Sequence, residues 1–530
     1  MTTSESEYSN LVRNKSGSGH SIFVAVYIWP GFFGSVFLAI GSLGVGWFPL
    51  TANALEWSWV NFLQTDALGQ SLARAFVVVG AALLLQAWLI VGIDALHNKI
   101  SNLKTMYVAL AAWCLPLVFT PPLFSRDVFS YYMQGKLQLA GYNPYETGVA
   151  LVPGWFQSGV DPLWGEAPTP YGPAFLLIEK YIANLSGQSA LTGALWFRFT
   201  ALIGVAILAV GIPYLARQHG VSDVSALWLG AMNPLVIMHF VAGAHNDALM
   251  VALVVLALVF GLNRRWILAS VLATLALGIK PVAIVVLPFL AYLSAQHLVT
   301  DYSTAREIWR TRVTHGLRIG LVSAITLVSL SYLAGVGALG WLSALGTPGT
   351  VKSWLSPFTA IGMGFGQFMV LLGFENRVDF YVTITRAIGS LVMALIVMFL
   401  VLKPQGRSAT RGAAFAFCTL VAFGPVIQPW YLLWGIPLLA ASGLSHKYVR
   451  AAVIVIAAFT IHGIANSSAT TDSFMDLSDG VAILLAIVIL AIAALASPHE
   501  RQLILGDKAE SGIKPMTPDQ IELHQNMIIR

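Results

Sequence analysis

Long apolar runs dominate the chain from Ser21 to Ser497. Each run is roughly 20 residues long, which is enough for a helix to cross a hydrocarbon core of about 30 Å. The runs are continuously apolar, whereas the strands of membrane barrels alternate apolar and polar residues. The pattern therefore predicts an all-α polytopic integral membrane protein.

We expect about 14 transmembrane helices, within a range of roughly 13–16, because about that many apolar runs are separated by polar loops. Eleven of them cover about 22–48, 74–96, 105–122, 191–216, 225–243, 317–342, 382–402, 412–427, 430–443, 449–468 and 479–497, and three more lie between 243 and 317. The segments 171–187 and 358–374 do not fit as spans, because the loop charges after them would then fall on the wrong side. We expect them to be interfacial or re-entrant helices in outer loops.

The distribution of charge predicts how the helices are oriented in the membrane. Only 10% of the residues are charged, against about a quarter in soluble domains. The basic residues lie in alternate short loops such as 97–104, 264–265 and 303–318, and the positive-inside rule makes these loops cytoplasmic. The net charge of +5 is therefore a signature of topology, and no long basic patch for nucleic acid is present.

This orientation divides the chain into three parts. Residues 1–21 and 498–530 are expected to be cytoplasmic tails, and 22–497 a transmembrane domain of a multi-pass plasma-membrane protein. The outer loop 121–190 holds the interfacial helices. Cys114 and Cys418 lie inside apolar runs, so neither a disulfide framework nor a thiol metal site is predicted.

The threading brings unusual polar residues to one face, the outer one. Ionisable groups at membrane depth are costly and usually mark function. The residues that gather there are Arg126, Asp127, His245, Asn246, Asp247, Lys280, Lys352, Gln428, Trp430 and Tyr431.

Each of these groups also has a purely structural interpretation. Asp127 and Asp247 suit helix N-termini, and Lys280 can extend its ammonium to the interface. The stretch "QPWYLLW" (428–434) is compatible with an aromatic belt or with a surface that stacks on sugar rings. His245 and Asp247 can ligate metal, but the sequence offers no third ligand at a convincing spacing.

Taken together, the groups favour sugar transfer from a lipid. A carboxylate can remove a proton from an attacking hydroxyl, and cations can stabilise a departing phosphate. A site on the outer face has no access to nucleotide sugars or ATP. A sugar linked to a lipid phosphate, held by an apolar groove between helices, is therefore the expected donor.

The order of these motifs resembles the GT-C superfamily of membrane glycosyltransferases. The stretches that carry the resemblance are "SRDVFSYYMQGKLQLAGYNPY", "PTPYGP", "AHNDAL", "GIKP" and "QPWYLLW", within about 105–435. They are most similar to the polyprenyl-phosphomannose-dependent α-1,6-mannosyltransferases that build the core of lipomannan and lipoarabinomannan. The acidic motif follows the third predicted span here, whereas many members place it after the first, an order that is compatible with two extra N-terminal helices.

The resemblance implies a role for each candidate residue. Asp127, in the outer catalytic loop, is the general base of an inverting mannosyl transfer. The donor phosphate is bound by Arg126, Arg198, His245 and Lys280. The sugar or acceptor is bound by Tyr131, Tyr132, Asn246, Asp247, Gln428, Trp430 and Tyr431.

The partners implied are a polyprenyl-phosphate mannose donor, a phosphatidylinositol mannoside or α-1,6-mannan acceptor, and the lipid bilayer, with no metal or other cofactor. Two alternatives remain open at this point. One is a transporter or lipid-linked-sugar flippase, although transporters place polar sites at the midplane of repeated halves and no repeat is evident. The other is a GT-C enzyme that uses another polyprenyl-phosphate sugar, such as arabinose.

Overall fold

The computed structural model describes residues 26–465 except 101, 297, 300–302 and 404–405. Within that part, every regular element is a helix. The first half contains Val26–Val45, η1 (Asn53–Glu56), α2 (Ser58–Thr65), α3 (Ala67–Leu96), α4 (Leu103–Cys114), η2 (Leu115–Leu117), α5 (Asp127–Leu139), η3 (Val149–Leu151), η4 (Pro162–Trp164), α6 (Pro173–Ser186) and α7 (Ala190–Gln218). The all-α class is therefore confirmed for the described residues.

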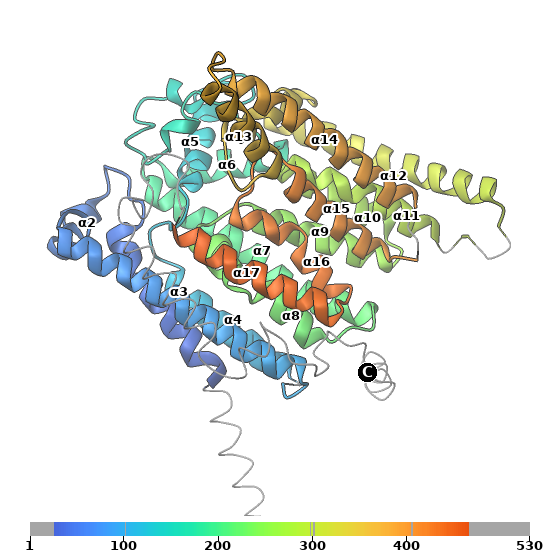
Figure 1. The fold of residues 1–530 in the computed structure, drawn as a ribbon, viewed down its shortest axis with the longest axis horizontal. Coiled ribbons are helices and arrows are strands. Elements are labelled where there is room, and N and C mark those ends of the chain that lie inside the picture. The colour runs from blue at the N-terminus through green and yellow to red at the C-terminus, as the bar shows by residue number, and fades with distance from the viewer. Residues whose placement is uncertain (1–25, 101, 297, 300–302, 404–405, 466–530) are drawn as a thin grey trace, which may run out of the picture.

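The second half continues with helices that are often short and broken. These are α8 (Asp223–Ala231), η5 (Val236–Ala242), α9 (Asp247–Leu262), α10 (Trp266–Ile279), η6 (Pro281–Val286), α11 (Leu287–Gln296), α12 (Ala305–Ala334), η7 (Gly340–Thr350), α13 (Pro357–Leu371), α14 (Val378–Leu402), α15 (Ala409–Phe423), η8 (Pro429–Trp434), α16 (Ile436–Ala441) and α17 (His446–Ala465). Figure 1 shows α7, α9, α10 and α16 inside the bundle, with α3 and α4 on one side and α12 and α14 on the other.

The described residues contain fewer long apolar helices than the number of spans that the sequence predicts. Six described helices are long and apolar enough to cross a membrane, or seven if the bent pair α8 and η5 counts as one span. Most of the other predicted spans become apolar helices of 10–17 residues. The expected count of about 14 is not confirmed, and the predicted span 479–497 and both predicted tails lie outside the described residues.

Prolines and irregular breaks mark the ends of several of these short helices. Lys280 ends α10 in an extended conformation before Pro281 begins η6, because proline cannot continue the hydrogen-bond ladder of the preceding helix. The pair α8 and η5 bends by 59° across Asn233-Pro234. The Asn233 side chain donates to the Leu229 carbonyl at 2.9 Å and accepts from the Val236 amide at 3.2 Å.

The two segments predicted not to span are short helices. At about 1.5 Å per residue, neither α6 nor α13 is long enough to cross about 30 Å of hydrocarbon. Although α6 was expected to lie at the interface, its Glu179 side chain is fully buried. Its helix packs against α5, α10 and α12.

The core is held by close contacts between helices that are distant in sequence. Trp88 of α3 and Trp228 of α8 stack with ring centroids 5.1 Å apart. Each indole nitrogen donates to the other residue's carbonyl, at 3.1 Å and 2.8 Å. In α7, a Cβ on Gly204 would meet the Ala248 backbone at 2.5 Å, so glycine allows α7 and α9 to touch.

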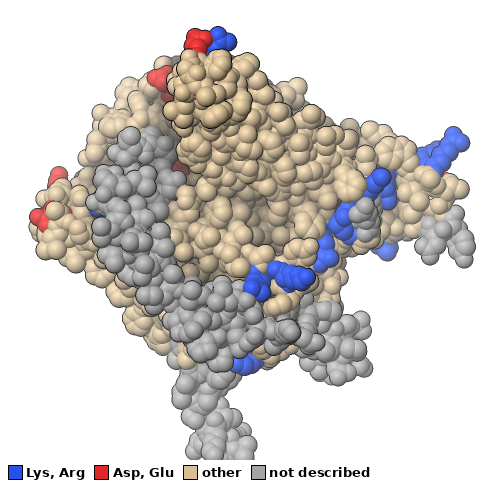
Figure 2. Space-filling model, in the orientation of Figure 1, with Lys and Arg blue, Asp and Glu red and all other residues tan. Residues whose placement is uncertain are grey.

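Charged side chains are segregated on the surface. Figure 2 shows Lys and Arg mainly along the edge below and to the right, near the first turns of α12 and the end of α14, with Asp and Glu mainly above and to the left. The segment predicted as the basic loop 303–318 is mostly the first turns of α12, which carry Arg306, Arg310, Arg312 and Arg318.

Candidate active site

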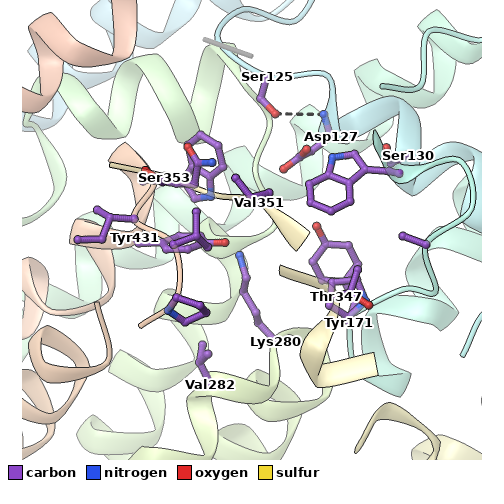
Figure 3. A pocket seen from close by; sticks show the side chains of 18 of the residues that line it. Ser125, Asp127, Ser130, Tyr171, Lys280, Val282, Thr347, Val351, Ser353 and Tyr431 are labelled. Carbon is purple, nitrogen blue, oxygen red and sulfur yellow. Dashed lines mark hydrogen bonds between the residues drawn. The ribbon is translucent and has the colours of Figure 1, made fainter. Parts of the chain in front are cut away.

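A cavity of about 540 Å³ lies where several of the helix breaks meet. Its walls come from the start of α5, the segment 161–171, the α10–η6 junction, the segment 345–355 and the segment 425–434. Figure 3 shows Asp127, Tyr171, Lys280 and Tyr431 directed into the same space from different walls. The volume lies within the range of about 300–1,000 Å³ that is usual for small-molecule sites.

Asp127 begins α5 on one wall of this cavity. Its amide donates to Ser125 Oγ at 3.1 Å, so the serine supports the helix start and leaves the carboxylate free to point inward. The Asp127 side chain is 22% exposed and lies outside the candidate membrane spans. Burial raises the pKa of this carboxyl to about 6, with Lys280 opposing the rise and Asp161 adding to it.

Lys280 lies on the cavity wall as half of a buried ion pair. Its ammonium donates to both oxygens of Asp247 at 2.8 Å, and Trp434 Nε1 donates to Asp247 Oδ1 at 2.5 Å. The ammonium also lies 4.8 Å from the centre of the Tyr431 ring. Because Asp247 is fully buried behind it, the pair fixes the position of one cation at the edge of the cavity.

His245 lies directly behind Asp127 and does not line the cavity. Its Nδ1 is 3.7 Å from Asp127 Oδ2, and its ring stacks on Trp430 with the centroids 3.8 Å apart. Burial lowers the pKa of His245 well below its usual range, so the ring is neutral. Within the described residues, neither ring nitrogen of His245 and neither side-chain atom of Asn246 forms a hydrogen bond.

Arg198, an expected phosphate ligand, is not brought to the cavity. It is buried in α7 and donates to the carbonyls of Val241, Ala242, Val118 and Thr120. Its donors therefore hold the end of η5 to the segment that follows η2. It forms no pair with Glu179, whose carboxylate has no hydrogen-bond partner among the described residues.

Three other residues that were expected to bind the donor or the acceptor make contacts within the protein. Arg126 lines the cavity but donates to the carbonyls of Gly159 and Val160, and its guanidinium lies 4.9 Å from the Trp47 ring. Tyr132 donates to the Gly187 carbonyl at 2.7 Å. Tyr131 packs edge-on against Tyr171, Phe175 and Phe197.

The remaining predicted residues lie at or beside the cavity. Gln428, Trp430 and Tyr431 line it, whereas Asn246 and Asp247 are buried behind the wall. Lys352 also lines it and pairs with Asp379. No group of three or more His, Cys, Asp or Glu side chains in the described part of the chain is arranged to hold a metal ion.

Sequence reasoning missed several lining residues. These include Ser130, Gln134, Asp161, Trp164, Tyr171, Thr347, Trp434 and His462. Tyr171 is part of "PTPYGP" and Trp434 of "QPWYLLW", so both motifs pointed to the right segments. Nothing in the sequence marked His462, which comes from the apolar helix α17.

Two family models match the chain. Residues 28–296 match the model described as "Alpha-(1->6)-mannopyranosyltransferase, N-terminal domain", and residues 358–497 match the model "MptB C-terminal domain".

Curated relatives cover most of the chain. It is 34% identical over 468 residues to a probable alpha-(1->6)-mannopyranosyltransferase of Mycolicibacterium smegmatis, covering 83% of this chain and 82% of that protein. It is 34% identical over 511 residues to an alpha-(1->6)-mannopyranosyltransferase of Mycobacterium tuberculosis, with coverage of 87% and 85%. An alpha-(1->6)-mannopyranosyltransferase B of Corynebacterium glutamicum is 29% identical over 446 residues, with coverage of 78% and 72%.

Proposed function

The chain belongs to the alpha-(1->6)-mannopyranosyltransferase family, and we propose that it transfers mannose from polyprenyl-phosphate mannose with inversion at the anomeric carbon. Membership makes it a glycosyltransferase, and the relatives support mannose as the sugar. The acceptor we propose is a phosphatidylinositol mannoside or its α-1,6-mannan extension. The product primes or extends the core of lipomannan and lipoarabinomannan.

One observation carries the proposed mechanism: a carboxylate and an ammonium line the same cavity among aromatic rings. Asp127 and Lys280 both line it, together with Trp430, Tyr431 and Trp434. A base must come within hydrogen-bond reach of the proton it removes, and a cation must lie where the leaving phosphate gains charge. Both roles are available in a single cavity, with ring faces for a sugar between them.

The proposed reaction has one displacement step. Asp127 takes the proton from the 6-hydroxyl of the acceptor mannose as that oxygen bonds to the anomeric carbon of the donor. The bond from the anomeric carbon to the phosphate oxygen breaks, and its electron pair leaves with polyprenyl phosphate. A β-linked donor thus gives an α-linked product. The Lys280 ammonium stabilises the charge on the leaving phosphate, and Asp247 holds that ammonium in place.

In this mechanism His245 positions Asp127 and does not bind the donor phosphate. The imidazole is buried 3.7 Å from the carboxylate and is covered on one side by Trp430. A neutral, fixed ring beside the base restricts the carboxylate without neutralising its charge. Trp430 in turn lines the cavity, so one indole supports His245 and offers a surface to the sugar.

We further propose that the cavity opens to the outer side of the plasma membrane, with both termini cytoplasmic. The separation of charge supports this orientation, because the arginine-rich first turns of α12 lie away from most of the acidic side chains (Figure 2) and the positive-inside rule places such basic segments in the cytoplasm. The donor would then be a lipid, since no nucleotide sugar reaches that side.

Reconstituted transfer tests the donor and the stereochemistry together. The full chain in proteoliposomes is given either labelled polyprenyl-phosphate mannose or labelled GDP-mannose, each with a short α-1,6-linked mannoside lipid. We expect an α-1,6-linked extension, identified by nuclear magnetic resonance, with the polyprenyl donor only. Transfer from GDP-mannose, or a polyprenyl arabinose donor that outcompetes the mannose donor, would overturn the proposed substrate.

A further inference from the structure

A second cavity, of about 400 Å³, lies on the basic side of the molecule, outside the proposed active site. It runs between α11, the first half of α12 and the last residues of α14, which come together at the right of Figure 1. Most of its lining is apolar, with Leu287, Pro288, Ala291, Ile319 and Val401 among the residues that form it. We call this cavity the α12 groove.

The polar end of the α12 groove is formed by Arg312 and Trp309. The lining residues of α12 recur at positions 309, 312, 313, 316, 319 and 320, which places them along one side of the helix. The Arg312 guanidinium lies 5.0 Å from the centre of the Tyr292 ring, and within the described residues it forms no ion pair. Glu307 is held by Thr304 in a capping box.

The apolar end of the groove is kept open by two glycines. A Cβ on Gly320 would meet no atom within 4 Å, and one on Gly316 would meet only the Ala291 Cβ, at 3.8 Å. The side of α12 that follows Arg312 therefore carries no side chain at positions 316 and 320, over about two turns. A flexible hydrocarbon chain fits such a surface, and a larger side chain at Gly320 would fill it without displacing protein atoms.

Helix α12 has little protein around it. It is a candidate span, and only 22% of its most apolar window is buried. Its first turns extend beyond the rest of the bundle (Figure 1), and Arg306, Arg310 and Arg318 are exposed there. Basic residues at the end of a membrane helix attract anionic lipids to that region of the membrane. The exposed Trp309 suits the depth of the headgroups.

We propose that the α12 groove binds an anionic glycerophospholipid of the membrane. Its phosphate lies against Arg312 beside Trp309, and one acyl chain lies over Gly316 and Gly320. The bound lipid completes the packing of α12, which the protein leaves open. This site is separate from mannosyl transfer, so its test does not depend on the proposed reaction.

Photo-crosslinking tests the site on the full-length protein. The chain is placed in phosphatidylcholine nanodiscs that contain a phosphatidylglycerol with a photoreactive acyl chain, and labelled peptides are mapped by mass spectrometry. We expect labelling in α11 and α12 that exceeds labelling by the matching phosphatidylcholine probe. Arg312→Gln should lower it about fivefold, whereas Arg310→Gln, which removes the same charge outside the groove lining, should have a clearly smaller effect.

A second pair of variants tests the shape of the groove. Gly320→Leu should abolish labelling, whereas Gly364→Leu, at an exposed glycine of α13 whose Cβ would also meet no atom within 4 Å, should preserve it. Equal labelling by both headgroups, or equal effects of the two variants in either pair, would overturn the proposal. Displacement of the probe by polyprenyl phosphate in preference to phosphatidylglycerol would also overturn it, because the groove would then belong to the donor lipid.

Discussion

Replacing Asp127 with asparagine should stabilise the protein at neutral pH, because the fold holds this carboxyl in a place that disfavours its charge. The pKa of Asp127 is raised by about 2 units to about 6, and each unit corresponds to about 1.4 kcal/mol. The raised pKa therefore lowers the folding stability by about 3 kcal/mol at neutral pH. This loss falls to about 2 kcal/mol because the side chain is 22% exposed and solvent screens part of the effect. Loss of a negative charge at the start of α5 offsets up to about 1 kcal/mol.

The size of this difference in stability depends on pH. A carboxyl whose pKa is higher in the folded state favours folding while it is protonated, and that contribution is lost as the pH rises through the folded value. The Asp127→Asn variant should therefore gain about 1–2 kcal/mol over the wild type above about pH 7, and the gain should shrink as the pH falls from about 6 towards 4.

Equilibrium unfolding in mixed micelles, followed by tryptophan fluorescence across this pH range, measures the difference. The matched control is Asp161→Asn, which alters a carboxylate of the same cavity that accepts from the Leu163 amide at 3.0 Å. This control keeps a side-chain oxygen that can accept from the Leu163 amide, so its stability at neutral pH should change less than that of Asp127→Asn. A destabilised Asp127→Asn variant at every pH would refute the reasoning, because Asp127 would then serve mainly as a structural residue at the start of α5.

Three further results should follow from the contacts around the cavity. The acid limb of the wild-type pH–rate profile should lie near pH 6. Asp161→Asn should move this limb to lower pH, because the charge of Asp161 raises the pKa of Asp127. A limb at the same pH in both proteins would contradict this prediction. Lys280→Met should lower the stability by about 3–5 kcal/mol, because it leaves Asp247 buried without its partner. Adding Asp247→Asn should restore most of that stability in mixed-micelle unfolding, and additive losses would contradict the pairing. Arg198→Gln should fail to yield folded protein by size-exclusion chromatography, because it leaves several buried carbonyls unpaired at about 1–3 kcal/mol each. A folded Arg198→Gln variant with only a raised KM would instead return Arg198 to phosphate binding.

The sequence predicts the type of fold and the segments of the site better than the role of each residue. Apolar runs identify helices because burial in lipid requires that composition along the whole run. The pattern does not show that Asn233-Pro234 bends the predicted span 225–243, or that several other predicted spans form helices of only 10–17 residues.

The orientation of side chains is also hidden from the sequence. Lys280 and Asp247 are 33 positions apart, and their pairing depends on how α9 and α10 pack. Arg198 was expected at the site because it lies near the end of a span, but the carbonyls that accept its hydrogen bonds come from segments 80 and 43 positions away in the sequence. Motifs thus located Asp127 and Tyr431, whereas only the packing separates a group that faces the cavity from one that supports its wall.

The proposed mechanism depends on Asp127 to remove the acceptor proton. It is tested most directly by single-turnover mannosyl transfer from polyprenyl-phosphate mannose with the purified wild type and Asp127→Asn, alongside donor affinity for both. We predict a rate about 10²–10⁴-fold lower for the variant, with donor affinity unchanged. A variant that binds donor normally and transfers mannose at a rate close to that of the wild type would contradict the assignment of Asp127 as the base.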